Sequence, residues 1–126
     1  MNSEMFNKGL SKRRKVLGDE YVDKALATAD EFGADLQKLI TEYAWGEVWN
    51  KEALSDKERS MINLGMISAL NRPHELELHI KGALNNGLTK EQIKDIFLQV
   101  TVSVSYTHLR AHETKANLVC RRLLEK

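Results

Sequence analysis

Two histidines bracket a short acidic stretch near the middle of the chain. Residues 74–79 read HELELH, so His74 and His79 are separated by five positions. A helical zinc site of the HExxH type needs two histidines four positions apart, with the glutamate between them as general base. Five residues turn a helix about 140° beyond one full turn, so the two imidazoles point to different sides. We therefore do not expect a metal site here.

His79 by itself is suited to proton transfer, because a modest change of environment sets the charge of an imidazole near neutral pH. The residue lies inside the apolar stripe of a predicted helix that starts at Pro73. The apolar members of this stripe are Leu76, Ile80, Ala83 and Leu84. A histidine in such a stripe is usually a hydrogen-bonded core residue, so its position alone leaves both readings open. His74 is expected to be exposed.

Arginine and glutamate side chains near this helix extend the possible chemistry. The planar guanidinium of arginine can hold a carboxylate through two hydrogen bonds, and Arg59 and Arg72 lie close to the histidine helix in the sequence. Glu75, four residues before His79, could orient the imidazole or shift its pKa. The ordinary alternative is a solvated polar face with paired arginines. Arg13 lies in the basic run SKRRK, which is typical of a solvated cluster.

Helical patterns cover most of the N-terminal half of the chain. Apolar residues recur at three- and four-residue spacing over residues 19–29, with Gly33 as the expected stop, and again over residues 34–44. The second pattern leads into YAWGEVW. Trp45 and Trp49 are most simply core or interface anchors, because each offers a large apolar surface for burial.

Two capping boxes predict helix starts further along. Ser55 with Glu58, and Thr89 with Gln92, have the spacing at which each side chain satisfies the other residue's backbone amide. With the histidine helix between them, these elements extend to about residue 102. The sequence therefore predicts an all-α fold, a compact array of about six helices.

Composition limits the class of protein. The 126 residues are enough for one domain, and a net charge of +1 provides no overall field to attract nucleic acid or an anionic membrane. No run of about 18 apolar residues occurs, so we expect no membrane span. Cys120 is the single cysteine, which excludes an intrachain disulfide and fits a reducing cytoplasm.

Several stretches, in order and spacing, resemble the carboxymuconolactone decarboxylase family. They are Arg13 to Asp19, Trp45 to Trp49, Arg59 with Ser60, and His79 followed by GALNNGLT, and together they extend over roughly residues 10–102. The resemblance implies a helical domain over residues 1–102 that assembles into a ring-like homo-oligomer, a trimer or hexamer. It implies decarboxylation of 4-carboxymuconolactone to the 3-oxoadipate enol-lactone in aromatic catabolism, with no metal and no organic cofactor.

The resemblance also singles out site residues. It favours His79 as the catalytic acid and base with Glu75 beside it, and Arg59, Arg72, Arg13 and Trp45 as contacts to a small lactone carboxylate. Alkyl hydroperoxidase D-like members of the superfamily carry two cysteines at the positions of Arg72 and Glu75. A disulfide-cycling peroxidase needs a thiolate with a resolving partner, so thiol peroxidase activity is disfavoured. Another carboxylated lactone or carbonyl substrate, or a non-catalytic helical oligomer, are the alternatives.

The chain departs from the family pattern after about Ser103. The glycine and proline of the expected turn are missing, and SYTHLRAHET resembles a translated sequencing adaptor. We interpret residues 103–126 as an atypical, non-native tail that is helical if ordered. His108 and His112 in this segment are four residues apart, but two convincing ligands do not make a metal site.

Overall fold

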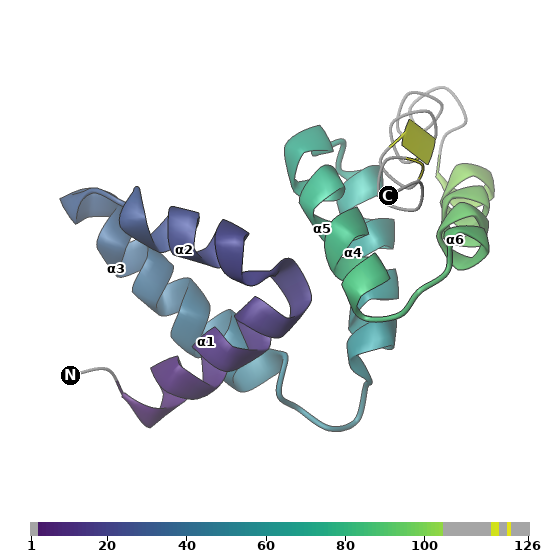
Figure 1. Cartoon of the computed structure of the whole chain (residues 1–126). Coiled ribbons are helices and arrows are strands. Elements are labelled where there is room, and N and C mark those ends of the chain that lie inside the picture. Colours follow the sequence, from purple (N-terminus) through teal and green to yellow (C-terminus); the bar gives the residue numbers. More distant parts are fainter. Residues whose placement is uncertain (1–2, 105–116, 119–120, 122–126) are drawn as a thin grey trace. The chain divides into compact units, whose positions relative to one another are not determined.

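The computed structural model describes residues 3–104, 117, 118 and 121. These residues form six α-helices and one π-helix and no strand, which confirms the all-α prediction (Figure 1). None of the helices in this part of the chain is long and apolar enough to cross a membrane. The chain divides into two compact units, residues 1–55 and residues 56–126, and each unit has its own packing.

The first unit is built on a close crossing of two helices. Its elements are α1 (Glu4–Leu17), α2 (Asp19–Ala27), α3 (Glu31–Leu39) and the π-helix η1 (Ile40–Val48). At the contact of α1 with η1, a Cβ on Gly9 would run into the carbonyl oxygen of Thr41. A Cβ on Gly46 would lie 2.6 Å from the carbonyl oxygen of Met5. The two glycines therefore let the backbones approach each other more closely than any larger residue would.

Two sequence expectations for this unit were wrong. Gly33 does not end a helix, because the Asp30 carboxylate accepts a hydrogen bond from the Gly33 amide at 2.7 Å and so caps the start of α3. The basic run does not form a fully solvated cluster either. It lies in α1, and Arg13 is only 4% exposed because that helix turns it toward η1.

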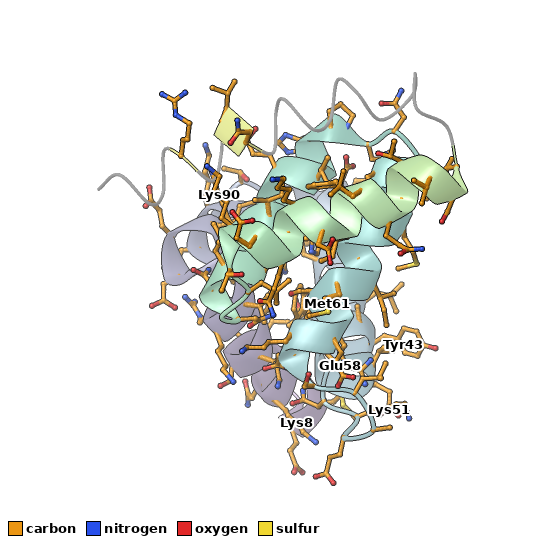
Figure 2. The ribbon with its side chains drawn as sticks, turned by 90° about the vertical axis from the view of Figure 1, so that its right-hand side faces the viewer. Lys8, Tyr43, Lys51, Glu58, Met61 and Lys90 are labelled. Carbon is orange, nitrogen blue, oxygen red and sulfur yellow. The ribbon has the colours of Figure 1, made fainter. Side chains whose placement is uncertain are left out.

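The two tryptophans anchor η1, as predicted. Trp45 and Trp49 are both buried, and their rings stack with centroids 4.7 Å apart. Tyr43 of the same π-helix is 64% exposed and extends away from the ribbon (Figure 2). The π-helix thus directs Trp45 to the interior, against Trp49 directly after its end, and leaves Tyr43 outside.

The described part of the second unit has three helices, with α4 packed against both others. They are α4 (Asp56–Ala69), α5 (Pro73–Asn85) and α6 (Lys90–Ser103). Pro73 occupies the first turn of α5, as predicted. The capping box at the start of α6 is confirmed, since Thr89 N donates to Gln92 Oε1 at 2.9 Å and Gln92 N donates to Thr89 Oγ1 at 3.1 Å. The helix starts are therefore determined locally.

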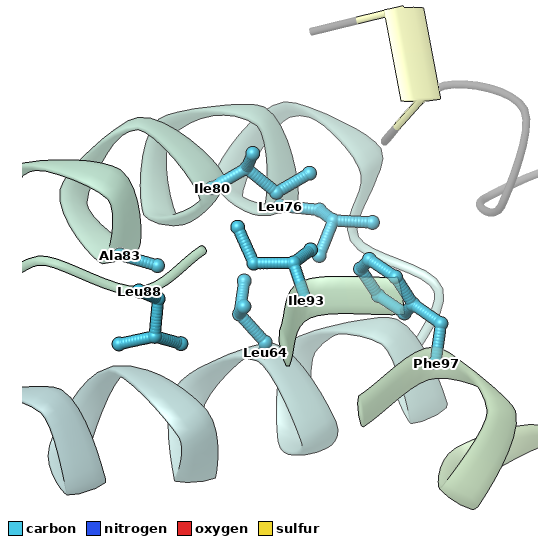
Figure 3. Close-up of a cluster of buried hydrophobic side chains, with 7 residues drawn as sticks. All are labelled: Leu64, Leu76, Ile80, Ala83, Leu88, Ile93 and Phe97. Atoms are coloured by element: carbon cyan, nitrogen blue, oxygen red, sulfur yellow. The ribbon is translucent and has the colours of Figure 1, made fainter. Parts of the chain in front are cut away.

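A continuous apolar cluster joins these three helices (Figure 3). Leu64 of α4 and Leu76 and Ile80 of α5 are fully buried, and burial of each such side chain contributes about 1.5–3 kcal/mol. The remaining members are Ala83, Leu88, Ile93 and Phe97. Because Leu76 and Ile80 must face this cluster, the rotation of α5 is fixed, and with it the direction of the side chains between them.

Candidate active site

His79 lies on α5 next to the buried Ile80 and is itself half-buried. Its Nδ1 atom is 3.4 Å from the side-chain nitrogen Nδ2 of Asn63, which comes from α4. Burial lowers the pKa of the His79 imidazole below its ordinary value, and the carboxylate of Glu75 opposes this by raising it. Burial and the Glu75 carboxylate therefore act on the pKa of His79 in opposite directions, and the effect of burial is the larger.

Glu75 is fixed at the start of α5 by Arg72. The guanidinium Nη2 of Arg72 donates to Oε1 of Glu75 at 3.0 Å, with both side chains in contact with solvent. This hydrogen bond is the main reason that the pKa of Glu75 lies below its ordinary value. Glu75 is therefore a carboxylate at neutral pH. It lies one turn before His79 on the same side of α5, where its charge favours the imidazolium.

Arg59 is half-buried on α4, four residues before Asn63. Residues four apart share one face of a helix, so Arg59 and Asn63 project from the same side of α4. The α4–α5 pair therefore supplies one cation close to the face that carries the Asn63–His79 contact and another, Arg72, at the start of α5.

Arg13 and Trp45, the other two predicted substrate contacts, belong to the first unit. The guanidinium Nη1 of Arg13 donates to the Thr41 hydroxyl at 3.1 Å, and its Nε atom is buried without a hydrogen-bond partner. Burial lowers the pKa of Arg13. Trp45 stacks on Trp49. The described contacts thus connect Arg72 with Glu75, and His79 with Asn63, whereas Arg13 and Trp45 have interior contacts in their own unit.

Asn63 was missed by sequence reasoning. The sequence feature that could have revealed it is a polar amide between Ile62 and Leu64, in a predicted helix whose neighbouring positions are mostly apolar. Its partner is 16 residues away, and only the packing of α4 on α5 brings the two side chains together. Among the described residues, no group of three or more histidine, cysteine, aspartate or glutamate side chains is placed to hold a metal ion. His108, His112 and nearly all of the predicted C-terminal helix lie outside the described residues.

Comparison with known proteins identifies the class of enzyme. The chain is 42% identical over 102 residues to the nitrosuccinic acid decarboxylase of Metarhizium robertsii. The matched region covers 81% of this chain and 71% of that protein. It is 36% identical over 103 residues to the 4-carboxymuconolactone decarboxylase of Acinetobacter baylyi, spanning 81% and 77%. It is 30% identical over 82 residues to peroxisomal protein 2 of Schizosaccharomyces pombe, spanning 62% and 38%.

The chain is accordingly a carboxy-lyase, an all-α decarboxylase with a half-buried histidine between two packed helices. The family model for the carboxymuconolactone decarboxylase family matches residues 34–112, which include all of α4, α5 and α6. The chain belongs to the carboxymuconolactone decarboxylase family. The family assignment made from the sequence is therefore confirmed.

Proposed function

We propose that this enzyme decarboxylates 4-carboxymuconolactone to the 3-oxoadipate enol-lactone, as in protocatechuate catabolism. The observation that carries the proposal is the half-buried His79, with Nδ1 against Asn63 and the Glu75 carboxylate one turn away. This arrangement provides a proton donor and acceptor whose charge can change near neutral pH. The 36% identity to a 4-carboxymuconolactone decarboxylase supports this lactone as the substrate.

The chemistry places limited demands on the protein. When the carboxylate leaves as CO2, its bonding electron pair stays on the ring carbon and spreads through the double bond onto the lactone carbonyl oxygen as a dienolate. The substrate supplies its own electron sink, so the protein must hold the carboxylates, stabilise the enolate oxygen and return one proton to carbon. One proton is consumed and one CO2 is released for each turnover.

Each of these tasks has a proposed residue. Protonated His79 delivers the proton from Nε2 to carbon and is then reprotonated from solvent. Arg59 and Arg72 bind the anionic carboxylates, and Glu75 keeps the pKa of His79 from falling further. Arg13 and Trp45 stay predicted substrate contacts. Both side chains are buried in the first unit, which fits a purely structural role equally well.

Nitrosuccinic acid is a second candidate substrate, because the 42% identity favours it. Loss of the carboxylate from its nitro-bearing carbon leaves an electron pair that the nitro group accepts as a nitronate. Here too an oxyanion forms, a second carboxylate remains and one proton returns to carbon. The same histidine and arginines would therefore serve both acids, and a single exchanged side chain around the substrate can decide between them.

We also propose that the enzyme is a cytoplasmic, ring-like homo-oligomer, a trimer or hexamer. Three large apolar side chains at four-residue spacing, two on α4 and one directly after its last residue, support self-association because they are 45%, 51% and 71% exposed in the chain by itself. They are Ile62, Met66 and Leu70. Light scattering after size-exclusion chromatography tests this directly, and a monomer at micromolar concentration would contradict it.

The activity is tested by offering the purified chain both acids separately and following CO2 release together with the product by NMR. Conversion of the lactone supports the first candidate, and conversion of nitrosuccinic acid alone supports the second. His79→Gln should lower kcat by roughly 10²–10⁴-fold, the usual contribution of a general acid. His74→Gln is the matched control, because His74 is an exposed histidine on the same helix. Near-normal turnover by a folded His79→Gln enzyme would exclude the proposed role of His79.

A further inference from the structure

We propose that Asn63 is a positioning residue that holds the His79 imidazole so that Nε2, and not Nδ1, exchanges the proton with the substrate. The inference rests on the proposed function for its catalytic meaning, but its structural content can be measured without any substrate. Nothing in the sequence pattern assigned a role to Asn63. The contact that does so is the 3.4 Å approach of its Nδ2 to Nδ1 of His79.

The orientation of the Asn63 amide and the tautomer of His79 are linked. In the structure the amide nitrogen faces Nδ1, and because an NH2 group can only donate, Nδ1 accepts in this orientation and carries no hydrogen. A neutral imidazole then has its proton on Nε2. Asn63 thus occupies Nδ1 and leaves Nε2 as the ring nitrogen that is open to a reacting molecule.

An amide can pair with both the neutral and the protonated imidazole, which neither a carboxylate nor an apolar side chain can do equally well. If Asn63 turns its amide over, its carbonyl oxygen can accept from Nδ1–H of the imidazolium. His79 therefore keeps one orientation through a proton-transfer cycle. A carboxylate at this position would favour the imidazolium alone, and an apolar side chain would leave Nδ1–H without a partner in a half-buried place.

Both residues of the pair stand next to fully buried core residues. Asn63 precedes the fully buried Leu64, and His79 precedes the fully buried Ile80, so the core cluster fixes both backbones. Two charged groups stand near the pair. Glu75 on α5 raises the pKa of His79, and Arg59 lies one turn away from Asn63 on α4, the helix packed against α5. Asn63 is the neutral partner through which the ring orientation is held.

The test is NMR of the full-length protein with 15N-labelled histidine, in which the two ring-nitrogen shifts report the tautomer and the pKa. The His79 signals are assigned by their loss in His79→Gln. In the unmodified protein, neutral His79 should carry its proton on Nε2. A proton on Nδ1 would overturn the proposal without any variant being made.

Two substitutions at position 63 sharpen the test. In Asn63→Leu, the Nδ1 shift should move and the pKa of His79 should fall, because the imidazolium loses its acceptor. In Asn63→Asp, the pKa should rise, because a carboxylate stabilises the imidazolium. Asn63→Ser replaces Asn63→Leu if the latter does not fold, since the shorter hydroxyl also withdraws the amide from Nδ1. Unchanged ring-nitrogen shifts in a folded Asn63→Leu or Asn63→Ser protein would overturn the proposal.

Turnover supplies a second, separate readout. Activity that depends on protonated His79 falls as the pH rises through the pKa of His79. The midpoint of this fall should lie at lower pH in Asn63→Leu and at higher pH in Asn63→Asp than in the unmodified enzyme, with kcat changing more than KM. Gln99→Leu, an exposed amide on α6, is the control and should leave the pH profile unchanged. If the NMR shifts respond as expected but neither acid is decarboxylated, the proposed function fails while the positioning of His79 stands.

Discussion

The guanidinium of Arg72 and the carboxylate of Glu75 form a 3.0 Å ion pair that stands one helical turn before His79 on α5. Both side chains contact solvent, so the pair contributes little to stability. Its consequence is electrostatic, because it keeps Glu75 ionised where that charge raises the pKa of the imidazole. Burial and Glu75 therefore act on His79 in opposite directions.

Replacement of Glu75 by Gln should move the pH profile of decarboxylation to lower pH. Without the carboxylate, burial alone acts on His79, its pKa falls further, and less of it is protonated near neutrality. The measurement is kcat against pH. Glu77→Gln is the matched control, since Glu77 pairs with Lys81 one turn along the same helix and is not among the groups that shift His79. An equal displacement in both variants would contradict a specific effect of Glu75.

Acidification should destabilise the folded chain through His79. The folded-state pKa lies below the ordinary value of 6.5, so the unfolded chain binds this proton more readily. The free energy of unfolding should therefore fall as the pH drops through about 6.5 and level off below the folded-state pKa. Urea midpoints between about pH 8 and about pH 5 measure this. The component should be absent in His79→Gln and present in His74→Gln, and an unchanged pH dependence in His79→Gln would refute it.

The glycines of α1 and α4 should respond oppositely to alanine. In Gly9→Ala the new methyl group would meet the backbone carbonyl of Thr41, which cannot move aside cheaply, so a loss of about 1–3 kcal/mol or more is expected. In Gly65→Ala the nearest atom is Cγ2 of Val100 at 4.0 Å, and helix propensity should add up to about 1 kcal/mol of stability. Thermal unfolding distinguishes them, and equal effects would contradict the close crossing of α1 with η1.

Helix starts and buried helix faces could be predicted from the sequence, because the residues that form them are close together in the chain. The Thr89–Gln92 capping box and Pro73 in the first turn of α5 each involve contacts within a few residues. The apolar stripe around His79 likewise predicted the buried positions of Leu76 and Ile80. Asp30 shows the limit of such reasoning. Its side chain caps the start of α3 by accepting from the amide of Gly33, the residue that was expected to end a helix.

The sequence by itself determined the family and the helices α4, α5 and α6, since periodic burial and capping are encoded over short stretches, and it singled out His79 as a candidate. It did not predict α1 or the π-helical form of η1. Only the tertiary structure decided that Asn63 contacts His79 and that Arg13 is buried against Thr41. The partners in these contacts are 16 and 28 residues apart. Such pairs depend on how one helix is rotated and shifted along another. The packing of many apolar side chains together sets that arrangement, and the sequence neighbours of either partner do not.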